Sequence, residues 1–209
     1  MRIAREGHPF IFTTAALALL AFGLGWNWPG LFLALLSLGF LGFFRDPERV
    51  PPSGEELILS PADGRVVSIR PVDRGGVFGD AATAVSIFLS PLDVHVNRAP
   101  VNGKVEEVRY RKGHFFAAYK EVASRNNEQN GLRIVDARGR RLGVVQIAGV
   151  LARRIVCYGK PGDSLARGQR LGMIMFGSRV DVFLPAGSTV EVVDGQRVRG
   201  GETIIGRFS

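Results

Sequence analysis

The sequence has a single cysteine, Cys157, among its 209 residues. One thiol cannot form a disulfide within the chain, so no disulfide framework holds the fold, and a reducing compartment is compatible with it. An isolated cysteine of this kind is typical of a small buried hydrophobic residue. The fold therefore depends on an ordinary hydrophobic core, for which the length and the 46% of hydrophobic residues are sufficient.

Acidic residues are outnumbered: 27 Lys and Arg face 19 Asp and Glu, which gives a formal net charge of +8. Such a charge favours nucleic acid or an anionic membrane surface as a partner. The sequence has no run of clustered basic residues, no zinc-ligand spacing and no aromatic RNA-binding motif, so we expect no nucleic-acid partner. Residues 1–44 contribute only +1, and a basic domain tethered to a membrane is attracted to anionic head groups.

Charged residues are absent from Phe10 to Phe44, a run of 35 residues. A straight helix of that length would measure about 52 Å, well beyond the roughly 30 Å of a hydrocarbon core. The sequence Asn-Trp-Pro-Gly at 27–30 is typical of a turn and predicts a helical hairpin with arms at Phe10–Trp26 and Leu31–Phe44. Residues 1–44 are therefore expected to anchor the chain in a membrane, although the short second arm leaves a tilted or re-entrant insertion open.

Arginines flank this apolar segment, with Arg2 and Arg5 before it and Arg45 and Arg49 after it. The positive-inside tendency then predicts that both ends, and the domain that follows, lie on the cytoplasmic side of the cell membrane. A cleaved signal peptide is the alternative, but the apolar run is too long and no small-residue cleavage site is evident. Residues 45–52 contain three prolines and predict a stiff linker.

After residue 52 the apolar stretches are short and separated by glycines, which predicts strands. Glycine-bounded hairpin sequences recur at 162–168 and 195–201, so we expect one mainly β domain over 53–209. A flattened β-barrel or sandwich resembling biotinyl and lipoyl carrier domains fits this pattern, but the lysine that a carrier modifies is not evident. The segment 115–123 is the one helical candidate. The expected strands are 57–59, 66–69, 84–89, 105–110, 132–135, 142–147, 153–157, 173–176, 180–184 and 189–193.

The pair Gly177-Ser178 lies between two of these apolar stretches. Most such pairs are tight turns, but glycine also tolerates strained backbone conformations, and attack of the serine hydroxyl on the glycine carbonyl would convert the amide to an ester. The serine needs a base, and histidine is the simplest one near neutral pH. Of the three histidines, His8 precedes the apolar segment and His114 is expected in an exposed turn. His95 is the remaining candidate, and strand alternation would place it on one face with Asp93 and Asn97.

Five segments, in order, resemble the phosphatidylserine decarboxylases, in particular their short bacterial and archaeal form. Together they extend over most of the chain from Arg45 to the end. They are Phe43–Pro47 (FFRDP), Ser60–Val66 (SPADGRV), Phe88–Pro100 (FLSPLDVHVNRAP), Asn126–Glu128 (NNE) and Phe176–Pro185 (FGSRVDVFLP).

The resemblance implies a proenzyme that cleaves itself between Gly177 and Ser178 and converts Ser178 into a pyruvoyl group. Residues 1–177 and 178–209 would stay together as a heterodimer, and a higher oligomer stays open. The substrate amine would form a Schiff base with the pyruvoyl ketone, which acts as the electron sink without pyridoxal phosphate or a metal ion. Phosphatidylserine in the membrane would thereby become phosphatidylethanolamine and CO₂.

The resemblance also implies that Asp63 acts with a histidine and Ser178 in a charge relay. Many family members carry two histidines three residues apart, and in those members the second histidine is the one assigned to the charge relay. In this chain His95 aligns with the first, and Arg98 stands in place of the second. Either His95 serves both cleavage and decarboxylation, or another base assists cleavage. The candidate contacts for the lipid phosphate, with solvated surface charge as the alternative, are Arg98, Lys104 and Arg179.

Two rival functions are compatible with parts of the sequence. A non-enzymatic, membrane-tethered adaptor with a lipoyl-like domain fits the composition, but it gives no reason for Gly177-Ser178, His95 and Asp63 to occur in these contexts. A pyruvoyl decarboxylase acting on a soluble amino acid fits the candidate site, but the apolar hairpin favours a lipid substrate.

Overall fold

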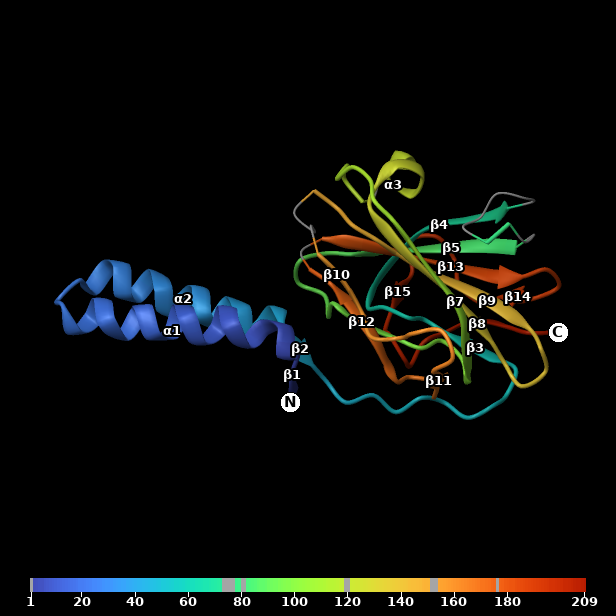
Figure 1. The fold of residues 1–209 in the computed structure, drawn as a ribbon, viewed down its shortest axis with the longest axis horizontal. Coiled ribbons are helices and arrows are strands. Elements are labelled where there is room, and N and C mark those ends of the chain that lie inside the picture. The colour runs from blue at the N-terminus through green and yellow to red at the C-terminus, as the bar shows by residue number, and fades with distance from the viewer. Residues whose placement is uncertain (1, 73–77, 80–81, 119–120, 151–153, 176) are drawn as a thin grey trace. The chain divides into compact units, whose positions relative to one another are not determined.

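The computed structural model describes residues 2–72, 78–79, 82–118, 121–150, 154–175 and 177–209. The chain divides into two compact units, Met1–Glu48 and Arg49–Ser209. The first unit is helical and the second is built mainly of strands (Figure 1). The predicted mainly β class, preceded by N-terminal helices, is confirmed, whereas the likeness to biotinyl and lipoyl domains stays a prediction.

The first unit is a pair of helices, α1 (His8–Gly23) and α2 (Asn27–Phe43). A short connection joins them, and within it Gly25 has a φ of +75°, a conformation that favours glycine. A 3₁₀ turn (Arg5–Gly7) precedes α1, and strand β1 (Arg2–Ile3) pairs antiparallel with β2 (Arg45–Asp46). The second helix begins at Asn27, four residues before the predicted start. Proline in a first turn costs no hydrogen bond, so Pro29 does not delay the helix.

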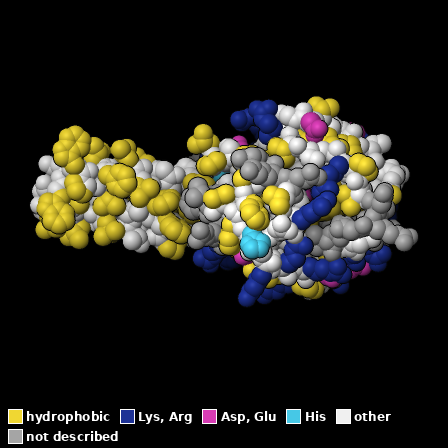
Figure 2. All heavy atoms as spheres, turned by 90° about the horizontal axis from the view of Figure 1, so that it is seen from above, with side chains coloured by type: hydrophobic (Ala, Val, Ile, Leu, Met, Phe, Trp, Pro, Cys, Tyr) yellow, Lys and Arg dark blue, Asp and Glu magenta, His cyan; other side chains and the backbone are white. Residues whose placement is uncertain are grey.

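The two helices contact each other through small residues. Ser37 Oγ donates a hydrogen bond to the Ile11 carbonyl at 3.2 Å, and a Cβ at Gly30 would lie 2.7 Å from the Phe22 ring. The other helix faces carry exposed apolar side chains, such as Trp28 at 81% exposure, which cover this unit in Figure 2. Among the helices in the described ranges, none is long and apolar enough to cross a membrane. Anchoring by this unit stays a prediction.

The second unit is built around an antiparallel sheet of eight strands that curls into a half-barrel (Figure 1). Two three-stranded sheets, β10-β12-β6 and β14-β16-β3, complete the domain. The eight strands, in sheet order, are β11 (Ser164–Leu165), β7 (Gly103–Arg111), β8 (Gln129–Val135), β9 (Arg141–Ile147), β13 (Ser178–Pro185), β5 (Ala82–Leu89), β4 (Gly64–Val72) and β15 (Arg197–Val198). The smaller sheets contain β10 (Ile155–Cys157), β12 (Arg170–Ile174), β6 (Val96–Arg98), β14 (Thr189–Val190), β16 (Ile204–Arg207) and β3 (Leu57–Leu59).

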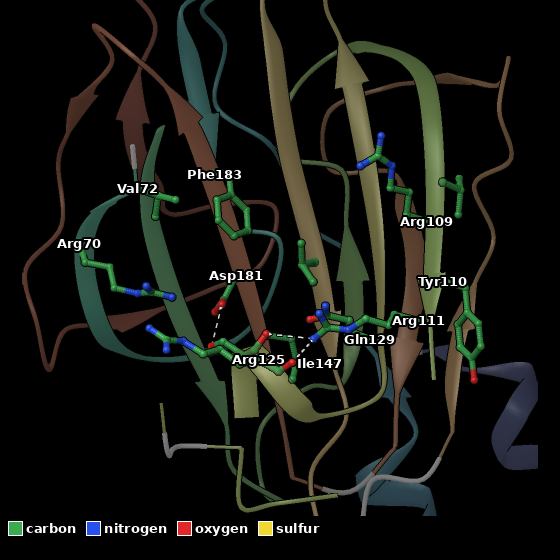
Figure 3. A pocket seen from close by; sticks show the side chains of 13 residues that line it. Arg70, Val72, Arg109, Tyr110, Arg111, Arg125, Gln129, Ile147, Asp181 and Phe183 are labelled. Atoms are coloured by element: carbon green, nitrogen blue, oxygen red, sulfur yellow. Dashed lines mark hydrogen bonds between the residues drawn. The ribbon is translucent and has the colours of Figure 1, made fainter. Parts of the chain in front are cut away.

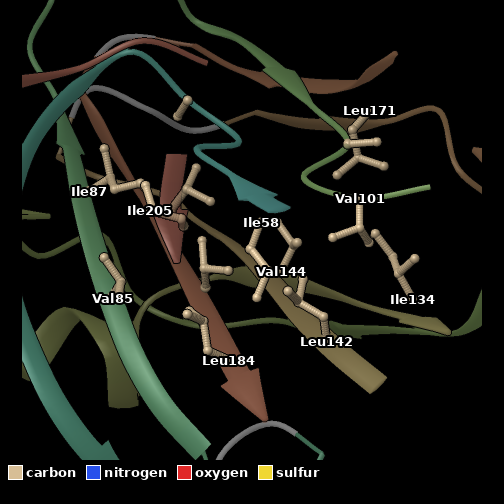
Figure 4. Packing of buried hydrophobic residues seen from close by; sticks show 14 of the residues in the cluster. Ile58, Val85, Ile87, Val101, Ile134, Leu142, Val144, Leu171, Leu184 and Ile205 are labelled. Carbon is tan, nitrogen blue, oxygen red and sulfur yellow. The ribbon is translucent and has the colours of Figure 1, made fainter. Parts of the chain in front are cut away.

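The hydrophobic core lies on one face of the eight-stranded sheet. Ile87, Val144 and Leu184 of this sheet pack in one cluster with Ile58 and Ile205 of the smaller sheets (Figure 4). Residues alternate between the faces of a strand. On β13, Val180, Val182 and Leu184 therefore face the core, while Arg179, Asp181 and Phe183 face the opposite side.

A short helix, α3 (Glu121–Asn126), packs on that opposite side, where Ala123 contacts Val145 and Ile147. It overlaps the C-terminal end of the predicted helical segment 115–123.

The predicted strands are present in the structure with shifted ends. The strand predicted at 173–176 is β12, at Arg170–Ile174, and residues 153 and 176 lie outside the described ranges. The expected strand through Asp93 and His95 begins only at Val96, because the Asp93 carboxylate accepts the Ser90 N–H and closes a turn.

Candidate active site

Gly177 and Ser178 lie where the chain enters β13. Gly177 has a φ of +68°, in the left-handed region that side-chain-bearing residues rarely adopt. The Ser178 side chain is fully buried, and within the described part of the chain its Oγ has no hydrogen-bond partner. A buried hydroxyl without a partner is costly and typical of catalytic sites. This peptide thus combines an uncommon backbone conformation with an unpaired nucleophile.

His95 is also fully buried and contacts the backbone N–H of Gly177. Its Nδ1 lies 2.9 Å from the carbonyl oxygen of Asp93, which can only accept, so in the neutral ring Nδ1 carries the proton. Nε2 is then an acceptor, and the Gly177 N–H donates to it at 3.4 Å. The unprotonated ring nitrogen therefore lies at the N–H of Gly177, the residue that precedes Ser178, and this is the protonation state that a general base requires.

The carbonyl of Gly177 packs directly against Gly149, two residues after the end of β9. A Cβ at position 149 would lie 2.0 Å from the Gly177 oxygen and 3.3 Å from the Ala118 Cβ. Because the first distance is far inside van der Waals contact, any other residue at 149 would displace this carbonyl. The absence of a side chain at Gly149 thus allows the carbonyl to lie here, a role that the sequence alone did not indicate.

Asn127 fixes the segments around Gly149. Its side chain is fully buried, its Oδ1 accepts the Phe116 N–H at 2.9 Å, and its Nδ2 donates to the carbonyls of Phe116 and Ala148, both at 2.7 Å. The residue after it, Glu128, accepts the Ala148 N–H through its own carbonyl. The Asn126–Glu128 motif signals this site in the sequence, but only the structure gives Asn127 a role.

Asp63 belongs to a different group of hydrogen bonds. Its Oδ1 accepts the Gly200 N–H at 2.8 Å, and its Oδ2 accepts from Arg49 Nη2 at 2.7 Å. Burial raises the pKa of Asp63; the Gly200 hydrogen bond and the Arg49 charge oppose this shift, and the Asp93 carboxylate adds to it. The resemblance implies contact between Asp63 and the imidazole. In the structure Asp63 bonds to an arginine, and the His95 Nδ1 bonds to a backbone carbonyl.

The three candidate phosphate contacts lie on three different strands. Arg98, on β6, is buried, and its Nη1 donates to the Gly168 carbonyl at 3.0 Å. Lys104, on β7, is exposed. Arg179 is buried on the face of β13 opposite Ser178, where Asp181 accepts from its Nε at 2.6 Å and Ser86 from its Nη2 at 2.6 Å. The Arg179 charge is therefore neutralised within the protein, on the face turned away from the candidate nucleophile.

Comparisons with known proteins identify the family. A family model described as phosphatidylserine decarboxylase matches residues 36–206. A protein of Geobacter sp. (strain M21), named phosphatidylserine decarboxylase proenzyme, is 47% identical over 210 residues, which cover 98% of this chain and 95% of that protein. A protein of the same name from Symbiobacterium thermophilum is 49% identical over 206 residues, covering 99% and 95%. The similarity thus includes the N-terminal helices as well as the β domain.

Proposed function

The chain belongs to the phosphatidylserine decarboxylase family, and on that premise we propose that it converts phosphatidylserine to phosphatidylethanolamine and CO₂ with a pyruvoyl group made from its own Ser178. One observation carries the proposal: the buried, unpaired Ser178 hydroxyl follows a glycine with a φ of +68°, whose N–H bonds to His95. The word proenzyme in the names of the relatives also supports processing of the chain.

Cleavage begins when Ser178 Oγ attacks the carbonyl carbon of Gly177 and its proton passes to Nε2 of His95. The new C–O bond replaces the C–N bond between the two residues, and the freed nitrogen takes up the proton. Loss of the proton on the α-carbon of residue 178, with departure of the Gly177 carboxylate, leaves dehydroalanine. Tautomerisation and attack by water then release ammonia and leave a pyruvoyl group at the N-terminus of 178–209.

The two products of this cleavage stay paired through the sheet. β13 belongs to the 178–209 chain, and its neighbours on both sides, β5 and β9, belong to the 1–177 chain. Ser178 is the first residue of β13, so cleavage of the bond before it leaves the whole of β13 in the 178–209 chain. The mature protein is therefore a heterodimer of 1–177 and 178–209.

Decarboxylation uses the same residues. The pyruvoyl group supplies a carbonyl that condenses with the substrate amine and takes up the electron pair left by CO₂. His95 Nε2, which lies at Gly177 next to position 178, takes up the proton that the substrate ammonium loses on condensation and then donates it to the substrate α-carbon. Arg98 does not substitute for the missing second histidine, because a guanidinium stays protonated. We therefore assign both steps to His95, and to Asp63 the positioning of the segments that carry Arg49 and Gly200.

The N-terminal helices bring this chemistry to its substrate. Their exposed apolar side chains, including Phe12, Leu19 and Trp28, fit insertion among lipid tails. The arginines on either side of the helical unit favour a cytoplasmic location for both ends. On this proposal the β domain works at the cytoplasmic surface of the cell membrane.

The test is an assay of the purified full-length protein in detergent with phosphatidylserine and, separately, with free serine. We expect release of CO₂ and formation of phosphatidylethanolamine from the lipid alone, and no activity in Ser178→Ala. Turnover of free serine at an equal rate would favour the soluble-substrate rival. A folded, cleaved protein that decarboxylates neither compound would refute the proposed function.

A further inference from the structure

A cavity of about 950 Å³ lies on the face of the eight-stranded sheet that is turned away from Ser178. Asp181 and Phe183 of β13 line it, on the face opposite the core residues Val180 and Val182. The other walls come from β4, β7, β8, β9 and α3 (Figure 3). The cavity is therefore separate from the site at Gly177–Ser178.

The lining is strongly cationic. Among the described residues that line it, four are arginines and one, Asp181, is a carboxylate, which already pairs with the buried Arg179. Two of the arginines are engaged with the protein. Arg111 donates to the carbonyls of Ser124 and Arg125 at the end of α3, and Arg109 pairs with Glu107.

Arg70 and Arg125 are the two cations that remain. Among the described residues, no acidic side chain pairs with either one, and the Nε of Arg70 is buried without a hydrogen-bond partner. In Figure 3 the two guanidinium groups extend from β4 and α3 toward the same part of the cavity, near Asp181. Like charges directed at one place repel unless an anion lies between them. Planar guanidinium groups are well suited to phosphate, which they bind in a bidentate manner.

The remaining wall of the cavity is apolar. Val72, Val145, Ile147 and Phe183 line it, and Tyr110 stands at one side. The volume is near the upper end of the range for small-molecule sites, and a free phosphate ion would leave most of it empty. Apolar walls beside the Arg70 and Arg125 guanidinium groups fit a phosphate group that carries an apolar chain.

We propose that this cavity binds the phosphate of an anionic phospholipid, with Arg70 and Arg125 on the phosphate and the apolar wall on the lipid chain. The site is additional to the one at Ser178 and does not depend on decarboxylation. Free phosphate shares the same recognition chemistry, so the experiment has to separate the two sources.

The experiment measures binding to the full-length protein in phosphate-free detergent by native mass spectrometry and calorimetry. The probes are dihexanoyl phosphatidylglycerol, inorganic phosphate and dihexanoyl glycerol, which lacks the phosphate. We expect the phosphatidylglycerol to bind, and the double variant Arg70→Ala/Arg125→Ala to lose one bound lipid and to raise the Kd at least tenfold. Lys160→Ala removes an exposed cation that does not line the cavity, and this control should retain the binding.

Each alternative outcome is distinct. An unchanged Kd in a folded double variant overturns the site, and so does an equal loss in Lys160→Ala, which would indicate general surface attraction. Equal affinity for inorganic phosphate would overturn the lipid as the ligand, and binding of dihexanoyl glycerol alone would overturn the role of the arginines. If the double variant does not fold, Arg125→Gln gives the same test, because this side chain is exposed on a short helix.

Discussion

The Nε2 atom of His95 accepts the N–H of Gly177 at 3.4 Å, although the two residues are 82 positions apart in the sequence. The other ring nitrogen is held by the carbonyl of Asp93. The hydrogen bond at Nδ1 fixes the tautomer, so the lone pair is on Nε2, at the N–H of Gly177, whose bond to Ser178 we expect to be cleaved. On this relationship rests the proposal that His95 alone serves both cleavage and decarboxylation.

His95→Gln should fold but process slowly. It removes the general base, whose contribution is typically about 10²–10⁴-fold in rate. We expect the proportion of cleaved chain, followed by gel electrophoresis after synthesis, to rise at least a hundredfold more slowly than in the wild type. His114→Gln, at an exposed histidine, is the matched control. Normal processing and full activity in His95→Gln would remove His95 from the mechanism.

Gly149→Ala should impair processing although it adds only one methyl group. The new Cβ would lie 2.0 Å from the Gly177 oxygen, so the carbonyl must move away from its position beside Ser178. Gly39→Ala makes the same change where no atom lies within 4 Å, and we expect it to process normally. Equal processing in the two variants would show that the position of the Gly177 carbonyl is not limiting.

Asp63 and Asp136 should affect stability in opposite directions as pH changes. The raised pKa of Asp63 means that the folded state binds the carboxyl proton more tightly than the unfolded state does. The contribution of Asp63 to the free energy of unfolding therefore falls as pH rises above 3.8. Burial also acts to raise the pKa of Asp136, but hydrogen bonds from Arg140 and Arg138 outweigh it and lower the pKa. The stability from Asp136 is present above pH 3.8 and is lost as pH falls below it.

Urea unfolding of the uncleaved Ser178→Ala protein, measured from pH 3 to pH 6, tests both assignments. In the parent protein, Asp63 makes the free energy of unfolding fall as pH rises, and Asp136 makes it rise. We expect Asp63→Asn to lack the first effect and Asp136→Asn to lack the second. A parallel response of the two variants would contradict the environment described for Asp63.

Asp181→Ala should destabilise the protein strongly, because Arg179 would be left as a buried cation without its carboxylate. Loss of one partner from a buried pair costs about 3–5 kcal/mol. Glu191→Ala removes one partner from an exposed pair with Arg207, for which about 0–1 kcal/mol is expected. Urea unfolding in the Ser178→Ala background measures both. Similar losses in the two variants would show that the Arg179 charge is stabilised in another way.

The sequence predicted the strands of the β domain because their apolar residues alternate between glycine-bounded turns. It also indicated Gly177, Ser178 and His95, since each lies in a local motif. Other features of the site depend on the folded conformation of the chain, which no local pattern encodes. They are the carbonyl partner of the His95 ring, the close approach of Gly149 to Gly177 and the hydrogen bonds of Asn127. The arginine cavity was missed for the same reason, because Arg70 and Arg125 come from a strand and a helix that meet only in the folded protein.

The most direct test of self-processing is the intact mass of the purified, folded protein before and after reduction with borohydride. We expect a fragment of residues 178–209, about 3.5 kDa, whose N-terminal ketone gains the mass of two hydrogen atoms on reduction. Ser178→Ala should give the uncleaved chain alone. A wild-type protein that remains a single 22.7 kDa chain, or a fragment that begins with an unmodified serine, would contradict the account.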